Sequence, residues 1–253
     1  MDSFVKRLPH PHPDKIRWEV LGLAWLARAR AVPIVEVFDH DERALRERRL
    51  ITVPPTRQAA EEFGRLLARM HAAGARAFGT GPDGWPQERP GWIGEADLPL
   101  GQYSHWGQFY AEARVAPYVR RAREAGLFAA GDSKTFDRLC ERLTAGDFDD
   151  DLPPARLHGD LWAGNALYTA DGVTLIDPAA HGGHPLTDLA MLELFGFAHL
   201  EAVWRGYSAE QPAARHWHQL VALHQVHPLL VHTVLFGAGY ADQALGAARI
   251  FAG

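Results

Sequence analysis

Three polar residues in the second half of the chain are of types that can hold a metal ion and move a proton. Asp160 and Asn165 lie in the segment 157–165 (LHGDLWAGN), and Asp177 follows the apolar run 173–176 (VTLI). Mg²⁺ prefers oxygen ligands and keeps several waters, so one amide and one carboxylate suffice beside a phosphate. A further carboxylate that stays off the metal can orient a hydroxyl group and accept its proton. The pattern is therefore suited to the metal-assisted transfer of a chemical group to a hydroxyl oxygen.

The same residue types are also common turn formers, so they could simply shape a tight loop. Two features favour a chemical role: the second Asp follows an apolar run, and Trp162 lies between Gly159 and Gly164, where no core helix would place it. An aromatic face beside a catalytic carboxylate can stack on a sugar ring or an amine. We therefore predict that Trp162 lines an acceptor site, with plain packing as the alternative.

The order Asp160, Asn165, Asp177 resembles that of protein kinases, which use a catalytic-loop Asp, an Asn on Mg²⁺ and a further Asp on Mg²⁺. The resemblance implies that Asp160 is catalytic and that Asn165 and Asp177 bind the metal. It also implies that Lys6 holds the α- and β-phosphates of ATP and that Glu19, on the following helix, is its ion-pair partner. Taken alone, Lys6 and Glu19 could equally be surface residues.

The elements that must carry these residues follow from the periodicity of apolar residues. We expect short strands at 3–6, 33–38, 50–53 and 173–176, and a charged surface turn at 41–49. We expect helices at 14–30, 56–74, 104–126, 132–145, 187–197, 212–236 and 240–251, and a long loop at 75–103. A small α/β segment thus precedes a large helical one. This order predicts an α+β fold with a boundary near Pro54-Pro55. The resemblance to kinases then implies two domains: 1–54, a partial nucleotide-binding lobe, and 55–253, a helical lobe with the catalytic loop and metal site.

A more specific resemblance rests on motifs spread over nearly the whole chain. They are His158–Trp162, Gly164-Asn165, Asp177–Ala179, Gly183-His184, Asp188–Met191, Leu194–Gly196, Trp106, Phe109-Tyr110, His227, Leu229-Leu230, His232, Leu235–Gly237 and Gly239-Tyr240. Together they resemble the fructosamine kinase family, which shares the protein-kinase-like fold with aminoglycoside and choline kinases. The resemblance implies a two-lobe fold, ATP and Mg²⁺ as cofactors, and a glycated amine or amino-sugar as the small-molecule substrate.

The chain departs from the family pattern at three places. Pro185-Leu186 stand where the family usually has Arg-Glu, and Ala163 replaces its usual Ser. Upstream of Phe4 there is no room for the glycine-rich hairpin, which needs about 12–15 residues. We therefore expect a truncated N-terminal lobe. Either the gene product continues upstream, which we favour, or the short form is genuine and binds ATP weakly or completes its site by oligomerising.

A literal match to the glycine-rich pattern occurs at Gly79–Gly84 (GTGPDG). It contains Pro82, follows an expected helix rather than a strand, and lies after Lys6 instead of before it. We therefore predict a structural loop at this position.

Composition excludes several classes of protein. The net charge of −5 and the lack of long basic runs argue against nucleic-acid binding. The single cysteine, Cys140, cannot form a disulfide within the chain, which fits a cytoplasmic protein. The sequence lacks an apolar signal segment and any run of about 18 apolar residues, so we predict no membrane span. A monomer and a dimer both remain compatible with it.

Three other functions are open from the sequence. The acceptor could be another amino-sugar or an aminoglycoside-like molecule, because the fold does not determine it. The protein could be a degenerate kinase-like binding protein, or, more remotely, a metallohydrolase using His158, His181 and His184. The histidines between 216 and 232 are expected to have packing roles.

Overall fold

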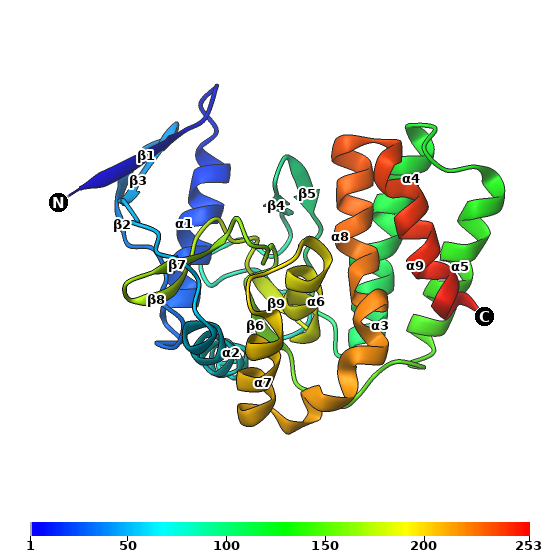
Figure 1. Ribbon diagram of the computed structural model, residues 1–253. Coiled ribbons are helices and arrows are strands. Elements are labelled where there is room, and N and C mark those ends of the chain that lie inside the picture. The colour runs from blue at the N-terminus through cyan, green and yellow to red at the C-terminus, as the bar shows by residue number, and fades with distance from the viewer. Residues whose placement is uncertain (1) are drawn as a thin grey trace.

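The computed structural model of the chain describes residues 2–253, apart from the side chain of Ala130. A small lobe with an antiparallel sheet is followed by a larger, mostly helical lobe (Figure 1). The small lobe comprises β1 (Ser3–Arg7), α1 (Pro13–Ala27), β2 (Val37–His40) and β3 (Ala44–Arg48). Among the residues described, no helix is long and apolar enough to cross a membrane.

The larger lobe is built from helices and short two-stranded ladders. The ladders pair β4 (Gly91–Ile93) with β5 (Ala96–Leu98), β6 (Ala155–Leu157) with β9 (His181–Gly183), and β7 (Ala166–Thr169) with β8 (Gly172–Leu175). The α-helices are α2 (Arg57–Ala72), α3 (Trp106–Phe109), α4 (Ala116–Glu124), α5 (Ala130–Thr144), α6 (Leu186–Phe195), α7 (Leu200–Glu210), α8 (Val221–Phe236) and α9 (Ala241–Ala252). A π-helical turn (Tyr110–Val115) joins α3 to α4, and 3₁₀ turns (Pro212–Leu220 and Ala238–Tyr240) precede α8 and α9.

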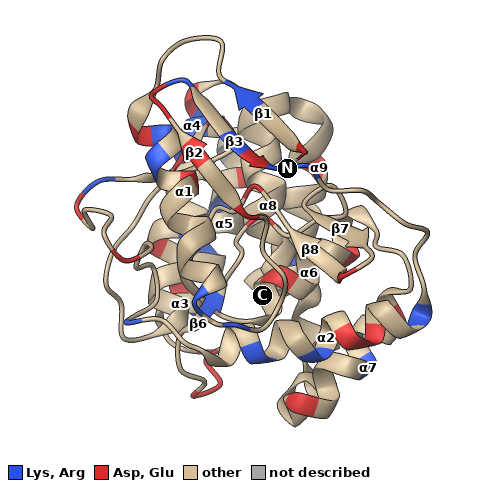
Figure 2. Cartoon of the chain, turned by 90° about the vertical axis from the view of Figure 1, so that its left-hand side faces the viewer, with Lys and Arg blue, Asp and Glu red and all other residues tan. Residues whose placement is uncertain are grey.

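The prediction of a surface turn at 41–49 is wrong, because β3 is the central strand of the small sheet, in the order β1–β3–β2. Its side chains alternate: Leu45 and Glu47 are buried, whereas Arg46 and Arg48 are exposed. These two arginines form ion pairs with acidic residues on and beside β2. Basic and acidic residues accordingly alternate over this face (Figure 2). The charge density reflects cross-strand pairing rather than a solvated turn.

The other predicted strands of the small lobe are also shifted. The strand expected at 33–38 begins only at Val37, and Ile34 instead forms an isolated parallel bridge with Leu175 at the end of β8. The strand expected at 50–53 is wrong as well, because this segment contributes only an isolated bridge from Thr52 to Thr169. Both bridges tie the small lobe to the β7–β8 hairpin, which precedes Asp177.

Helix α1 packs one face against the small sheet. Pro13 occupies its first turn, and His12 caps it by accepting a hydrogen bond from the Lys15 amide. Ile16 and Leu23 are buried in one cluster with Leu45 of β3. The same helix carries Glu19, which is 9% exposed. Packing of the apolar face therefore holds a carboxylate beside the sheet.

The helical prediction for 56–74 is confirmed by α2, which Thr56 caps through a bond to the Ala59 amide. Helix α7 was not predicted, although it packs closely on α2. A Cβ at Gly64 would lie 2.0 Å from the Val203 carbonyl oxygen, and one at Gly206 would lie 1.9 Å from the Glu61 carbonyl oxygen. The two glycines therefore allow the helix backbones to touch.

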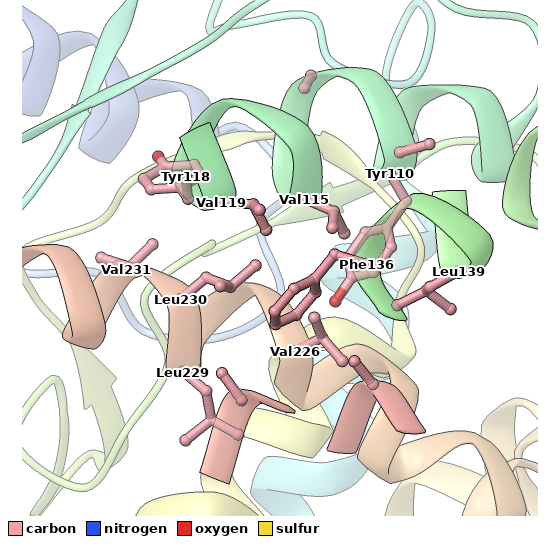
Figure 3. Packing of buried hydrophobic residues seen from close by; sticks show 14 of the residues in the cluster. Tyr110, Val115, Tyr118, Val119, Phe136, Leu139, Val226, Leu229, Leu230 and Val231 are labelled. Atoms are coloured by element: carbon pink, nitrogen blue, oxygen red, sulfur yellow. The ribbon is translucent and has the colours of Figure 1, made fainter. Parts of the chain in front are cut away.

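The main core of the larger lobe lies between α4, α5, α8 and α9 and the π-helical turn. Figure 3 shows how side chains from these elements meet, with Phe136 of α5 next to Val226 of α8 and Tyr110 of the turn. The Tyr110 hydroxyl donates to the Leu223 carbonyl oxygen (2.8 Å) and accepts from the His227 amide (3.0 Å). His224 and His227 are buried here, which confirms the packing role expected for them.

Glu47 is an exception to the pairing seen in β3, because its Oε1 is buried without a hydrogen-bond partner in the described part of the chain. Burial raises the pKa of its carboxyl to about 7; nearby Asp177 adds to this rise and Lys6 opposes it. Because the folded pKa exceeds the unfolded value of 4.5, this carboxyl favours folding below pH 4.5. That contribution is lost as the pH rises through about 7.

We therefore compare the change that Glu47→Gln causes in the free energy of unfolding at two pH values. At pH 8 this change should be about 1–2 kcal/mol more stabilising than at pH 5. Denaturant unfolding of wild type and variant at both pH values measures this difference. The exposed Glu141→Gln is the matched control and should show no such dependence. An equal change in the free energy of unfolding at both pH values would contradict the conclusion that burial disfavours the charged form of Glu47.

Candidate active site

The six residues predicted as site residues all line one pocket of about 290 Å³. They come from β1, α1, the loop after β6 and the turn after β8, and are Lys6, Glu19, Asp160, Trp162, Asn165 and Asp177. The structure therefore brings together residues that are more than 170 positions apart in the sequence. Their individual roles stay predictions.

Lys6 lies between two carboxylates. Its Nζ is 3.0 Å from each carboxylate oxygen of Glu19 and 3.0 Å from Oδ1 of Asp177. Burial opposes its positive charge, but the two carboxylates outweigh burial and the pKa of Lys6 is raised. Burial also raises the pKa of Glu19, to about 7, with Lys6 opposing the rise. The lysine is thus a fixed positive charge at the junction of the two lobes.

Asp177 has a left-handed backbone, with φ of 52°, two residues after the end of strand β8. An Asp tolerates this region better than a β-branched residue does. The turn directs its carboxylate to Lys6, and its side chain remains 38% exposed. One carboxylate oxygen is therefore paired with the lysine while the group still faces the pocket.

Asn165 links the loop that carries Asp160 to the segment that carries Asp177. Its Nδ2 donates to the Asp160 carbonyl oxygen (2.9 Å), to Asp160 Oδ2 (3.1 Å) and to the Asp177 carbonyl oxygen (3.5 Å). The backbone carbonyl oxygen of Asn165 accepts a hydrogen bond from the backbone amide of Ile176 (3.1 Å). The amide nitrogen, rather than the amide oxygen, makes these side-chain contacts.

Asp160 is mostly buried, and its carboxyl pKa is raised to about 6. Burial is the main cause; the hydrogen bond from Asn165 opposes it, and Asp177 adds to it. A carboxyl group with a pKa near 6 is mainly ionised at pH 7 and is a stronger base than an ordinary aspartate. It is therefore suited to accept a proton from a hydroxyl group.

Asp188 holds the loop before Asp160 in place through hydrogen bonds, a role that the sequence analysis did not predict. The carboxylate of this residue, which is 1% exposed, accepts from the amides of His158 (2.8 Å) and Gly159 (2.9 Å). It also accepts from Nε2 of His71 (3.1 Å), whose Nδ1 lies 2.7 Å from the Tyr207 hydroxyl oxygen. The signal that could have identified it is an acidic residue in the first turn of the mostly apolar helix 186–195.

Trp162 points away from the core, and its residue is 42% exposed. The indole lies across Gly164, where an added Cβ would come within 2.3 Å of the ring. A glycine is therefore needed for this orientation. Trp162 and Asp160 also line a second, larger pocket of about 630 Å³, so the two pockets meet at the loop that carries these residues.

Two other sequence features have structural explanations. Gly79–Gly84 forms an irregular loop, as predicted, in which the Gly79 amide donates to the Gly182 carbonyl oxygen (2.8 Å). Among the residues described, no group of three or more His, Cys, Asp or Glu side chains is arranged as a metal site. His158, His181 and His184 instead make separate hydrogen bonds, to the Ile176 carbonyl, the Ala179 carbonyl and Asp150.

Comparisons of the sequence and of the structure with known proteins find relatives that are assigned as kinases of fructosamines or ketoamines. The structure is similar to a crystal structure from Thermobifida fusca assigned as a fructosamine-3-kinase, with 44% identity, a TM-score of 0.88, and coverage of 98% of this chain and 84% of that one. A protein from Vibrio parahaemolyticus assigned as a ketoamine kinase is 32% identical over 72% of this chain and 60% of its own length. The aligned region therefore spans less than two thirds of that relative.

The fold extends to more distant proteins. The aminoglycoside phosphotransferase APH(4)-Ia, in a ternary complex with ADP and hygromycin B, has a TM-score of 0.57 at 20% identity, covering 93% of this chain and 84% of that one. This likeness confirms the predicted α+β, two-lobe kinase-like fold. The model of the fructosamine kinase family matches residues 1–249. The resemblance seen in the sequence motifs is thereby confirmed, and the chain belongs to the fructosamine kinase family.

Proposed function

We propose that this protein is a kinase that uses ATP and Mg²⁺ to phosphorylate a hydroxyl group on the sugar of a ketosamine. The observation that carries the proposal is the convergence of a lysine, two metal-suited oxygen groups and a basic carboxylate on one pocket. Membership of the fructosamine kinase family supports the ketosamine as acceptor. Residues 1–54 would bind nucleotide, and residues 55–253 would carry the catalytic loop. The protein would act in the cytoplasm.

Lys6 would bind the α- and β-phosphates of ATP. A lysine ammonium is a point charge on a flexible stem, so its direction depends on its partners. Glu19 contacts it with both carboxylate oxygens and would hold it toward the pocket. In the nucleotide complex, phosphate oxygens would share the lysine with these carboxylates.

Asn165 and Asp177 would hold Mg²⁺. The amide oxygen of Asn165 and the pocket-facing carboxylate of Asp177 form the kind of oxygen donor set that fits this ion, with waters and phosphates completing the shell. When bound, Mg²⁺ neutralises charge on the phosphates during transfer. Asn165 also bonds to Asp160, so the same residue would keep the base in register with the metal site.

Asp160 would act on the acceptor. Its carboxylate would accept the proton of the sugar hydroxyl while the hydroxyl oxygen forms a bond to the γ-phosphorus. The bond between the γ-phosphorus and the bridging oxygen breaks, and ADP leaves with that oxygen. The products are ADP, the phosphorylated ketosamine and a proton that Asp160 releases to water.

The proposal is tested by measuring Mg²⁺-dependent ATP consumption with fructosamines, ribulosamines and aminoglycosides in parallel. Consumption that requires a fructosamine or ribulosamine is the expected result. Consumption with aminoglycosides alone would assign a different acceptor. Binding of ATP without turnover of any acceptor would favour a non-catalytic kinase-like protein. Release of phosphate in the absence of ATP would favour a metallohydrolase.

Trp162→Ala is expected to raise the KM for the acceptor by about tenfold, with little change in the KM for ATP. Loss of an exposed aromatic face removes stacking on the sugar or amine but no contact with phosphate. Steady-state kinetics with each substrate varied in turn provides the measurement. Ile250→Ala, which removes another exposed apolar side chain outside both pockets, is the control. A larger effect on the KM for ATP would show that Trp162 belongs to the nucleotide site.

A further inference from the structure

The larger pocket beside the catalytic loop, here called the aromatic pocket, has a volume of about 630 Å³. It is formed by the β4–β5 hairpin, the catalytic loop, α6, α8 and the turn before α9, and the hairpin, α6 and α8 lie near one another in Figure 1. Its lining residues are Ile93, Gly94, Asp160, Trp162, Phe195, Val231, His232, Leu235, Phe236 and Tyr240. The reacting carboxylate is therefore at one wall of a mostly apolar space.

Three aromatic rings surround His232 on the wall of this pocket. The His232 ring centroid lies 4.7 Å from that of Phe195, 5.0 Å from Tyr240 and 5.3 Å from Phe236. Phe236, the last residue of α8, is 67% exposed, whereas most other residues of this helix are buried. A large aromatic side chain exposed at a pocket edge provides contact area for a ligand at little cost in conformational entropy.

His232 adds one polar group to the cluster. Its Nδ1 lies 2.8 Å from the Pro228 carbonyl oxygen, which can only accept, so Nδ1 carries the proton. The neutral ring then has an unprotonated Nε2, which accepts hydrogen bonds. Burial also lowers the pKa of His232 and so disfavours a second proton. The histidine therefore offers an acceptor without adding a positive charge.

The charge of the pocket limits what it can hold. Among its described lining residues, Asp160 is the single acidic side chain, and none is Lys or Arg. The secondary ammonium of a ketosamine can be balanced by Asp160 and by aromatic faces. A further ammonium in this pocket would lose hydration without gaining a carboxylate partner.

We propose that the aromatic pocket selects ketosamines whose amine carries an apolar or aromatic substituent and no second charge. This inference rests on the proposed function and specifies its acceptor. The sugar lies toward Asp160 and Trp162, and the amine substituent packs against His232, Phe236 and Tyr240. Polycationic amino-sugars are poor ligands of this site, because one carboxylate must serve both the reaction and all their charges.

Calorimetric titration tests the proposal with two ligands that differ by one charge. The first is the fructosamine of benzylamine, and the second is the fructosamine of 4-(aminomethyl)benzylamine, which has an added ammonium; kanamycin is the polycationic reference. We expect the first to bind at least tenfold more tightly than the second and kanamycin to bind more weakly still. Equal or tighter binding of the doubly charged ligand would overturn the proposal.

Two variants locate the effect. Phe236→Ala and His232→Leu are each expected to weaken binding of the benzylamine ligand by fivefold or more, and Ile250→Ala is the control that leaves it unchanged. Wild-type affinity in both pocket variants would also overturn the proposal. Turnover of the same ligands is measured separately, so a binding preference without phosphoryl transfer would refute the proposed kinase activity and leave the selectivity intact.

Discussion

Asp160→Asn is expected to lower kcat by roughly 10²–10⁴-fold while ATP affinity stays nearly unchanged. The amide has the size of the carboxylate but cannot accept the proton of the attacking hydroxyl. Asp160 lines both pockets, whereas the ammonium of Lys6 is paired with Glu19 and Asp177 and makes no ion pair with Asp160. Steady-state kinetics and calorimetric titration with ATP measure the two quantities.

The matched control for this variant is Asp171→Asn, which changes an exposed Asp in the β7–β8 turn. It should retain wild-type turnover and stability. Unchanged turnover in Asp160→Asn would remove the assignment of the catalytic base. A parallel loss of ATP affinity would instead place Asp160 in the nucleotide site.

Asp188→Ala is expected to lower the free energy of unfolding by about 3–5 kcal/mol and to reduce kcat as well. The change leaves the buried amides of His158 and Gly159 without their acceptor and removes the partner of His71. The loop that holds Asp160 would then lose its anchor. Urea unfolding measures the stability change, and kinetics under conditions where the variant is folded measure turnover.

Asp188→Asn separates charge from hydrogen bonding in this prediction. Its single amide oxygen can serve one of the two loop amides, so the variant should be intermediate in stability and in kcat. The exposed Asp137→Ala on α5 is the control and should change stability by less than about 0.5 kcal/mol. A loss below about 1 kcal/mol in Asp188→Ala would contradict the anchoring role.

The sequence could locate the centre of the site because Asp160, Asn165 and Asp177 lie close together along the chain. Their types alone suggested the chemistry, and the apolar run before Asp177 fixed its place at a strand end. Lys6 and Glu19 could be found only through the resemblance to kinases, since a surface lysine and a helical glutamate have no distinctive local signal. The structure brings all five to one pocket.

Other parts of the structure depend on contacts that the sequence pattern does not reveal. The sequence of strand β3 predicts a charged turn, because the pairing of its arginines with acidic residues on and beside β2 is visible only in the structure. The close packing of α7 on α2 depends on Gly64 and Gly206, which look like helix-weakening residues when read singly. The aromatic pocket combines residues from segments more than 140 positions apart, so its shape follows only from the tertiary fold.

The most direct test of the central claim is detection of the phosphorylated acceptor by mass spectrometry. The protein is incubated with ATP, Mg²⁺ and the fructosamine of benzylamine, and the ADP formed is measured in the same sample. The account predicts a fructosamine that has gained one phosphoryl group, in an amount equal to the ADP, and no product with Asp160→Asn on the same timescale. Formation of ADP with no phosphorylated fructosamine, or equal product from the variant, would contradict it.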